Sequence, residues 1–282
     1  MATLQAVKGR IRSVGGTRQI TKAMQLVAAS KLRKYQKLAK GPEQYTAAAR
    51  ELLEHLGGSR ALSVHSLYQV RQVRNVLTII IAGDHGMAGA YNGNVLRQLD
   101  LNVASYKVPQ LALCIGKHAA LHVARTPGVE ELAAYELEQD DSDLGLARPV
   151  LREAIDLFLS EAVDVVDIIY TRFHSTVRQE VVSERLLPVL PPAGNAVETK
   201  LEPDPDRLID HATRRILEAL LLQAILDAQA GEQASRMLAM MNATDNAKDL
   251  IDDLTLAYNN ARQTAITQQI SEISAGAEAM KD

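Results

Sequence analysis

Apolar side chains near the start of the chain recur every three or four residues. Such spacing places them along one face of an α-helix. No proline occurs before Pro42, while Gly15 and Gly16 are expected to loosen the helix locally, by roughly 1 kcal/mol per glycine relative to alanine. The pattern predicts a long helix over residues 1–58. The positions of its stripe are Leu4, Val7, Ile11, Val14, Thr21, Met24, Ala28, Leu32, Tyr35 and Leu38.

The last part of the chain repeats this spacing over a longer stretch. No proline occurs from Arg207 onward, which favours one helix, or two nearly continuous ones, over residues 207–282. Because helices in globular proteins average three to four turns, helices this long need a partner along much of their length. We therefore expect the first and last segments to form an antiparallel coiled coil. The stripe of the last segment is Leu250, Leu254, Ala257, Ala261, Ile266, Ile270, Ile273, Ala277 and Met280.

Between these segments the pattern changes to short apolar runs that alternate with helical stretches. Strands are predicted at residues 76–82, 110–115 and 163–170, and an edge strand of alternating character at 177–187. Helices are predicted at residues 92–99, 117–124 and 148–162. Strands that alternate with helices indicate parallel β-α-β units. The fold class is therefore α/β, with a small α/β domain over residues 74–192 inserted between the two arms of the coiled coil.

Composition narrows the classes of protein that fit. Hydrophobic residues make up 47% of the chain but aromatic residues only 4%, a balance that suits long helices. The net charge of −3 gives no reason to expect a nucleic-acid partner. Cys114 is the single cysteine, so no internal disulfide can form, which fits a reducing compartment. No apolar run approaches the roughly 20 residues of a membrane span, so we expect any link to a membrane to run through a partner.

The charges are distributed unevenly along the chain. No Asp or Glu precedes Glu43, whereas ten Lys and Arg residues occur there: Lys8, Arg10, Arg12, Arg18, Lys22, Lys31, Arg33, Lys34, Lys37 and Lys40. The final segment is acidic on balance. These charges form either solvated helix faces, each contributing little to stability, or a surface for an acidic partner. An acid-free, Arg-containing start also resembles a mitochondrial transit peptide, but it continues as one long helical pattern without a break typical of a cleavage site.

Several motifs in the sequence are candidates for a binding, metal or catalytic site. The turn Gly83–Gly89 lies between a strand and a helix, as phosphate-binding loops do, but it has neither the dinucleotide spacing nor a Walker lysine. His118 and His122 share a helix face without the further ligand that a zinc site needs. The acidic run 140–143 lacks the glycine and distal glutamate of a calcium loop. Cys114 falls inside a strand, which favours a buried and inert thiol. We predict no catalytic, cofactor-binding or metal site.

Several segments, in order along nearly the whole chain, resemble the gamma subunits of F-type ATP synthases. Residues 19–32 are similar to the N-terminal signature of that family, and residues 83–94 to its central glycine-rich segment. Residues 170–173 and 186–188 are similar to its third strand and hairpin, and residues 202–205 to the loop before its last helix. Residues 234–247 and 258–268 give the strongest match. The sequence departs from the family at Gly83 and His85, where Ser and Arg are usual, and this weakens any contact role of the central turn.

The resemblance implies a fold, a function and partners. The fold is a long antiparallel coiled coil with an inserted Rossmann-like domain. The function is that of a central rotor shaft without its own active site, turning inside a hexamer of alpha and beta subunits and joined to an epsilon subunit and a membrane c-ring. The resemblance places Lys22, Met24, Arg236, Gln268 and Gln269 at the stator, Ile270, Ile273, Ala277 and Met280 in an apolar bearing, and Tyr170, Glu202 and Asp204 at the c-ring or epsilon subunit.

The expected location is the cytoplasmic face of a bacterial plasma membrane, held there peripherally, in preference to a mitochondrial matrix or chloroplast stroma. No cofactor is expected. Two other classes of protein stay open from the residues alone. A coiled-coil scaffold would be stable and self-associating by itself, and a nucleotide-dependent enzyme acting through Gly83–Gly89 would bind nucleotide unassisted. A nucleic-acid binder would use the basic first forty residues, which lack stacking aromatics apart from Tyr35.

Overall fold

The computed structural model describes residues 4–56, 65–137, 145–190 and 205–279. The chain divides into two compact units, one made of residues 1–28 with 237–282 and the other of residues 29–236. These two units do not coincide with the three segments expected from the sequence, because each long helix contributes residues to both units. The boundaries of those segments stay a prediction.

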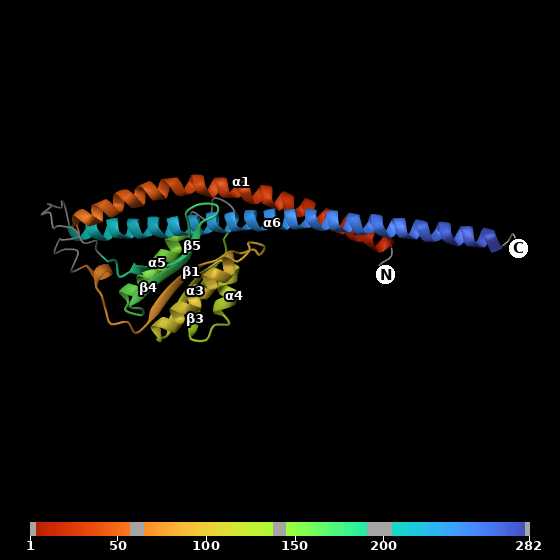
Figure 1. Cartoon of the computed structure of the whole chain (residues 1–282). Helices are drawn as coiled ribbons and strands as arrows, with labels where there is room; N and C mark the ends of the chain where they lie inside the picture. Colours follow the sequence, from red (N-terminus) through yellow and green to blue (C-terminus); the bar gives the residue numbers. More distant parts are fainter. Residues whose placement is uncertain (1–3, 57–64, 138–144, 191–204, 280–282) are drawn as a thin grey trace. The chain divides into compact units, whose positions relative to one another are not determined.

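Two long helices bracket the chain, as predicted (Figure 1). Helix α1 spans Leu4–Leu56 and continues through Gly15 and Gly16 without interruption. Helix α6 spans Pro205–Ala279, a single helix of 75 residues, which gives a length along its axis of about 110 Å. Pro205 occupies its first position, where the missing backbone N–H would have no helical partner in any case.

In the first unit the two helices pack through a seam whose spacing on α1 is the predicted one. Ala28 is buried and Leu4, Val7, Ile11 and Val14 are half-buried. The hydroxyls of Thr21 and Thr244 are hydrogen-bonded at 2.8 Å, so this polar position of the stripe is satisfied across the seam. An antiparallel coiled coil is thereby confirmed.

The α6 side of the seam differs from the predicted stripe by about one residue. Its inward positions, spaced by four and three, are Ala247, Ile251, Leu254, Tyr258, Ala261 and Ala265. Leu254 and Ala261 lie in the seam as expected. The other described positions of the stripe are exposed: Leu250, Ala257, Ile266, Ile270 and Ile273. The offset arises because Leu250 and Ile251 are adjacent and both apolar, so the spacing alone fits either of them.

The second unit is built on a five-stranded sheet in the order β3-β2-β1-β4-β5. The strands are β1 (Val76–Ile81), β2 (Gln110–Ile115), β3 (Val129–Tyr135), β4 (Val165–Phe173) and β5 (Gln179–Leu187). The first four are parallel, with Val76 opposite both Gln110 and Val165, and β5 runs antiparallel to β4 at the edge. The three buried strands and the edge strand expected from the sequence are confirmed, whereas β3 was not predicted.

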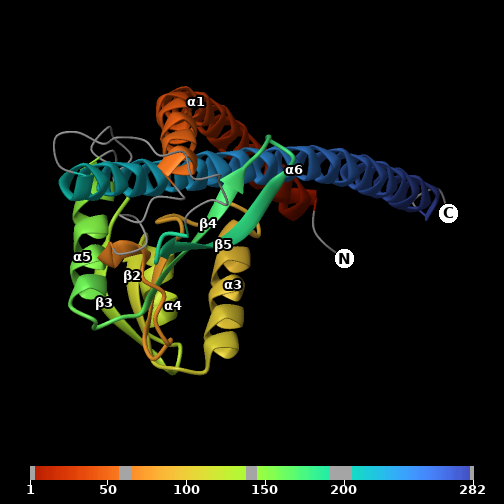
Figure 2. The ribbon, with the colours of Figure 1, turned by 90° about the vertical axis from the view of Figure 1, so that its left-hand side faces the viewer.

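Helices cover both faces of this sheet. On one face, α3 (Tyr91–Tyr106) and α4 (Lys117–Val123) pack over Ile80, Cys114 and Ile169. On the other, α5 (Ala147–Leu159), the short 3-10 helix η1 (Ser66–Tyr68) and residues 209–228 of α6 form the larger core. Figure 2 shows α3 and α5 on opposite sides of the sheet. Part of α6 is therefore a core helix of the α/β layer, and the same helix continues into the coiled coil.

Candidate functional site

The glycine turn that follows β1 is held in shape by the chain itself. The Asn92 side chain accepts a hydrogen bond from the Gly83 backbone N–H at 2.9 Å and donates one to the His85 carbonyl at 3.4 Å. Met87 adopts a left-handed conformation with φ of 60°, as does Gly89 with φ of 59°. Asn92 is the second residue of α3, so the first turn of that helix fixes the shape of the loop before it.

Asp84 in this turn binds two backbone amides of other segments. Its carboxylate accepts hydrogen bonds from the backbone N–H of Lys117 at 2.7 Å and of Leu137 at 2.8 Å. The first of these amides begins α4 and the second follows β3. Through Asp84, the turn is therefore bonded to the start of α4 and to the segment after β3, as a structural turn would be.

Removing this carboxylate is expected to loosen the carboxyl edge of the sheet. Asp84→Ala leaves two backbone donors without their acceptor, so we expect a loss of about 2 kcal/mol in the free energy of unfolding. Hydrogen exchange of the β3 amides measures the loss. The control is Asp100→Asn, which weakens an exposed pair with His122 and is expected to change little. Equal effects of the two variants would contradict the assigned role.

The same turn packs directly against α6. A Cβ atom at position 83 would lie 2.8 Å from the carboxyl carbon of Glu232, so the glycine found there in place of the family's usual serine leaves room for this side chain. Arg236 pairs with Glu232 and donates to the carbonyls of His85 at 3.3 Å and Gly86 at 3.4 Å. A charged pair on the long helix thus holds the backbone of the turn.

Two further hydrogen bonds join α6 to the α/β layer at this level. The Tyr91 hydroxyl donates to the Ala228 carbonyl at 2.9 Å, and the Ser235 hydroxyl donates to the Gln179 side chain at 2.6 Å. Burial raises the pKa of Tyr91, and the nearby carboxylate of Glu232 raises it further, so this phenol keeps its proton and remains a donor. Residues 228–236 of α6 are therefore bonded to α3, to β5 and to the glycine turn.

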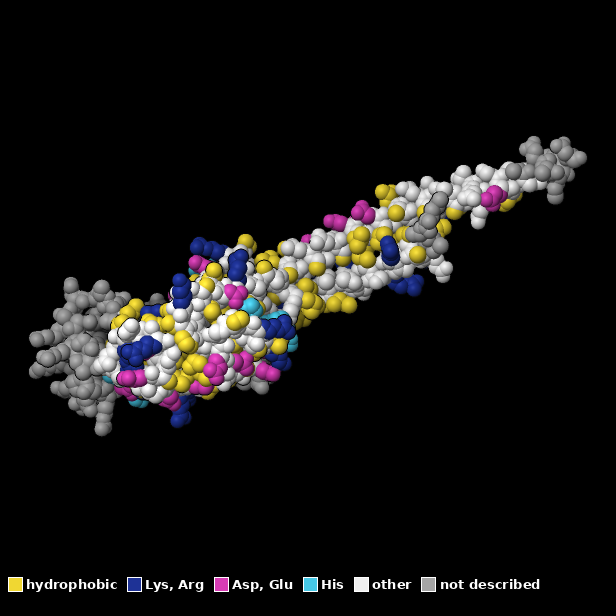
Figure 3. Space-filling view, turned by 90° about the horizontal axis from the view of Figure 1, so that it is seen from below, with side chains coloured by type: hydrophobic (Ala, Val, Ile, Leu, Met, Phe, Trp, Pro, Cys, Tyr) yellow, Lys and Arg dark blue, Asp and Glu magenta, His cyan; other side chains and the backbone are white. Residues whose placement is uncertain are grey.

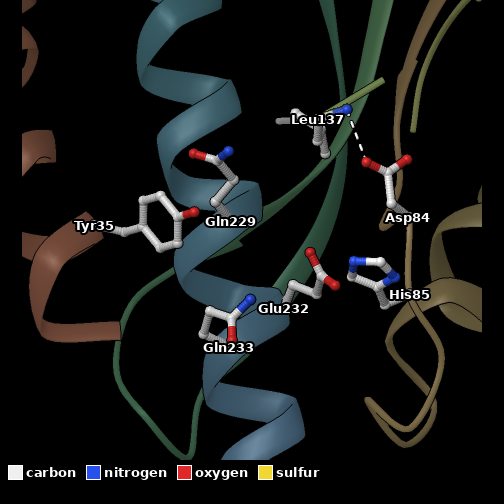
Figure 4. A pocket seen from close by; sticks show the side chains of 7 residues that line it. All are labelled: Tyr35, Asp84, His85, Leu137, Gln229, Glu232 and Gln233. Atoms are coloured by element: carbon white, nitrogen blue, oxygen red, sulfur yellow. Dashed lines mark hydrogen bonds between the residues drawn. The ribbon is translucent and has the colours of Figure 1, made fainter. Parts of the chain in front are cut away.

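A small hollow lies between these groups (Figure 4). Its volume of about 10 Å³ is comparable to one water molecule and far below that of a nucleotide. In Figure 4 Tyr35 lies across from Gln229, while Glu232 and His85 lie close together on its other side. It is lined by Tyr35, Asp84, His85, Leu137, Gln229, Glu232 and Gln233.

Two of the side chains expected at partner surfaces, Arg236 and Tyr170, are mostly buried within this chain. Arg236 is 8% exposed because Glu232, one helical turn earlier, directs its guanidinium onto the glycine turn. Tyr170 is 5% exposed because β4 is covered on both faces. Its hydroxyl donates to Glu184 at 3.1 Å and accepts from Arg172 at 2.9 Å, so Tyr170 supports that surface pair from below.

The other expected contact residues differ in what can be said of them. Lys22, Gln268 and Gln269 are exposed and Met24 is half-buried. Ile270 and Ile273 are among the most exposed apolar side chains, at 59% and 72%. Glu202 and Asp204 lie outside the described residues, as do the side chains of Ala277 and Met280.

Further apolar side chains on the coiled coil face outward and were not singled out from the sequence. On α1 they are Ile20, Leu26 and Val27, each more than half exposed, and on α6 Leu256. Ile266, which the sequence placed in the stripe, is 47% exposed. Figure 3 shows hydrophobic side chains along the surface of the paired helices. Apolar side chains mark an interaction surface where they form a contiguous patch, whereas single ones are common on any protein surface. These residues could be found in the sequence as apolar positions outside the seam, but only once the positions of the seam are known.

The remaining candidates for chemistry are accounted for by local structure. His122 pairs with Asp100 at 2.9 Å, and burial raises the pKa of the Cys114 thiol to about 12, with the Glu131 charge adding to the effect. Among the described residues, no three His, Cys, Asp or Glu side chains gather in a way that would hold a metal ion. Within the same residues, none of the helices combines the length and the hydropathy needed to span a membrane. The acidic run 140–143 lies outside the described residues.

Solved structures share this fold. One similar chain belongs to the Euglena gracilis mitochondrial ATP synthase, in a structure of its OSCP, F1 and c-ring parts in rotational state 3. The TM-score is 0.70 at 19% identity, covering 98% of this chain and 94% of that one. A chain from the rotor of the same enzyme in rotational state 1 has a TM-score of 0.69, covering 93% and 98%. At such identities the likeness concerns the fold alone.

Sequence comparison extends the likeness to the whole chain. Residues 3–280 match the family described as ATP synthase. The ATP synthase gamma chain of Moorella thermoacetica is 36% identical over 100% of both chains, and that of Chloroherpeton thalassium is 37% identical over 100% of this chain and 99% of its own. The resemblance noted from short segments is therefore confirmed along the full length. The chain belongs to the family of ATP synthase gamma chains.

Proposed function

We propose that this chain is the rotating central shaft of an F-type ATP synthase, coupling ion flow through a membrane c-ring to ATP synthesis or hydrolysis in an alpha–beta hexamer. The observation that carries the proposal is the match to gamma chains over both entire lengths. A 75-residue helix that belongs to the α/β layer at one end and to a coiled coil at the other supports it, because such a helix can carry rotation from one to the other.

The coiled coil is proposed to act on the hexamer through contacts that differ from one face to another. Lys22, Met24, Gln268 and Gln269 are the proposed stator contacts, with the outward apolar residues of α1 beside them. An asymmetric shaft biases each catalytic site among states of different nucleotide affinity only if its contacts differ between those states. The basic start of α1 would meet acidic surface of the beta subunits, which mainly affects orientation and specificity.

The end of α6 is proposed to turn in an apolar bearing. Ile270 and Ile273 are exposed, and Ala277 and Met280 continue the same spacing. Apolar contact is non-directional, so a sleeve lined with similar residues would hold the helix without fixing its angle. At the opposite end, Glu202 and Asp204 are proposed to contact the c-ring or epsilon subunit.

The chain is proposed to have no catalytic site and to need no cofactor of its own. Asp84 fills the start of α4, and the hollow beside it accommodates about one water molecule. The proposed location is the cytoplasmic face of a bacterial plasma membrane, where the chain would be peripheral and held by its partners.

Purification of the tagged chain from its own cells tests the proposal. We expect alpha and beta subunits to accompany it in excess, together with ATPase activity, and we expect the chain alone to bind no ATP in equilibrium dialysis. Mixing the chain with separately purified alpha and beta subunits should rebuild that activity. A chain that elutes alone, or that binds nucleotide unassisted, would favour the scaffold or the nucleotide-dependent enzyme instead.

A further inference from the structure

The way in which α6 is attached to the α/β layer changes along the helix. From Ile209 to Ala228 the attachment is mainly apolar, through the larger core, with two polar contacts, from Thr213 to the Tyr68 hydroxyl and from Glu218 to Arg148. From Ala228 to Arg236 the attachment combines close packing at Gly231 with hydrogen bonds to Tyr91, Gln179 and the glycine turn. Hydrophobic contacts are non-directional, whereas hydrogen bonds are strong only at defined distances and angles. The hydrogen bonds of residues 228–236 therefore add directional resistance to rotation of the helix within the layer.

The Glu232–Arg236 pair is the charged part of this attachment. Glu232 is 6% exposed and Arg236 is 8% exposed, and charged side chains are rarely so buried unless they are paired and hydrogen-bonded. By contrast, Arg152 and Asp156 on α5 have the same spacing of four residues but are 82% and 66% exposed, 3.9 Å apart. The spacing of four residues therefore does not explain the burial of the Glu232–Arg236 pair, which comes from its contacts with the glycine turn.

One nitrogen of Arg236 serves three acceptors. Its Nη2 reaches a Glu232 carboxylate oxygen and the carbonyls of His85 and Gly86, which are adjacent residues of the turn. The carboxylate also lies against Gly83, at the start of that turn. Without the negative charge of Glu232, the guanidinium would be buried with only neutral carbonyl partners and would be drawn toward water.

We propose that Glu232 is a positioning residue for torque transfer, which through Arg236 fastens the Gly83–Gly89 turn to α6 so that the α/β layer and the helix rotate as one body. This inference rests on the proposed rotor function. A rotational load on the α/β layer reaches the coiled coil through α6, so a loosened attachment lets the layer turn without the helix. Neither residue is proposed to take part in the chemical step in the hexamer.

The test uses the complete membrane-bound complex with Glu232→Gln, which keeps the shape of the side chain and removes its charge. Asp156→Asn is the matched control, because it makes the same chemical change in an exposed pair. We expect hydrogen exchange of the turn amides to rise about tenfold and protons pumped per ATP hydrolysed to fall, while ATP hydrolysis continues. Glu232→Asp keeps the charge and is expected to recover part of the pumping.

The outcomes separate this inference from the function on which it rests. A wild-type chain that does not assemble with ATPase subunits would refute the rotor function itself. If Glu232→Gln assembles and either the turn stays protected or the pumping ratio equals that of the control, the inference is wrong. A variant that only lowers the melting temperature shows a structural role and also overturns it. If Glu232→Gln does not assemble, Arg236→Lys is measured in the same way, and loss of assembly in both would assign the pair to folding.

Discussion

Replacing Gly116 with alanine is expected to destabilise the α/β layer by about 4 kcal/mol or more. Gly116 follows β2 with φ of 96°, a conformation that costs other residues about 1–3 kcal/mol. A Cβ atom there would also lie 2.0 Å from the Ala82 carbonyl oxygen and 2.8 Å from its carbon. The clash is with backbone, so no side-chain rotation relieves it.

The surrounding strands prevent the backbone from moving aside. The Ala82 N–H donates to the Ile115 carbonyl at 2.9 Å, and the Gly116 N–H donates to the Tyr135 carbonyl at 2.8 Å. A shift large enough to admit a methyl group would break these bonds, which join β1, β2 and β3 at their carboxyl ends. The cost is therefore expected to appear across the whole edge of the sheet.

Gly128→Ala separates the two sources of this cost. Gly128 has φ of 86°, yet nothing lies within 4 Å of the position of its missing Cβ atom, so the variant adds strain without a clash. We expect a loss of about 1–2 kcal/mol there. Hydrogen exchange of the β1 amides in the full-length chain measures both variants. If the two losses are equal, the clash inferred at Gly116 does not exist.

The long helices and the buried strands could be predicted because their signals are strong and local. Periodic apolar residues without proline specify helices, and continuous runs such as Val76–Ile81 specify strands buried on both faces. Strand β3 was missed because Val129 is its only β-branched residue and the adjacent Glu130 and Glu131 interrupt the alternation typical of a strand. Pro127 and Gly128, which precede it, were the available signal that a turn leads into a strand.

The contact residues were harder to predict, for a different physical reason. An arginine that meets a partner and an arginine that is buried on its own chain have the same sequence pattern. Arg236 is buried because Glu232 lies one turn before it and Gly83 leaves space beside this pair. The helix brings Glu232 and Arg236 together, but only tertiary structure brings Gly83 to them. Likewise, the choice between Leu250 and Ile251 for the seam depends on the facing helix, which the periodicity of one segment does not describe.

Replacing Gly231 with leucine is expected to push α6 away from β4 and to lower the free energy of unfolding by about 3 kcal/mol. A Cβ atom at this position would lie 3.1 Å from a Thr171 methyl carbon and 3.6 Å from the Tyr91 ring. The remaining carbons of leucine would have no space between the helix and the strand. Alanine adds only the Cβ atom, so Gly231→Ala is expected to have a much smaller effect.

Gly276→Leu in the same helix is the control, because nothing lies within 4 Å of the position of its missing Cβ atom. There the change is expected to stabilise the helix by up to about 1 kcal/mol through propensity alone. Hydrogen exchange of residues 224–236 measures the effect at Gly231. Because Gly231 lies between the hydrogen bonds at Ala228 and Ser235, its leucine variant should also weaken both of them and expose the glycine turn. A variant that leaves these amides protected would show that α6 and β4 are not in close contact at Gly231. The rigid attachment inferred for α6 would then lose this contact as support.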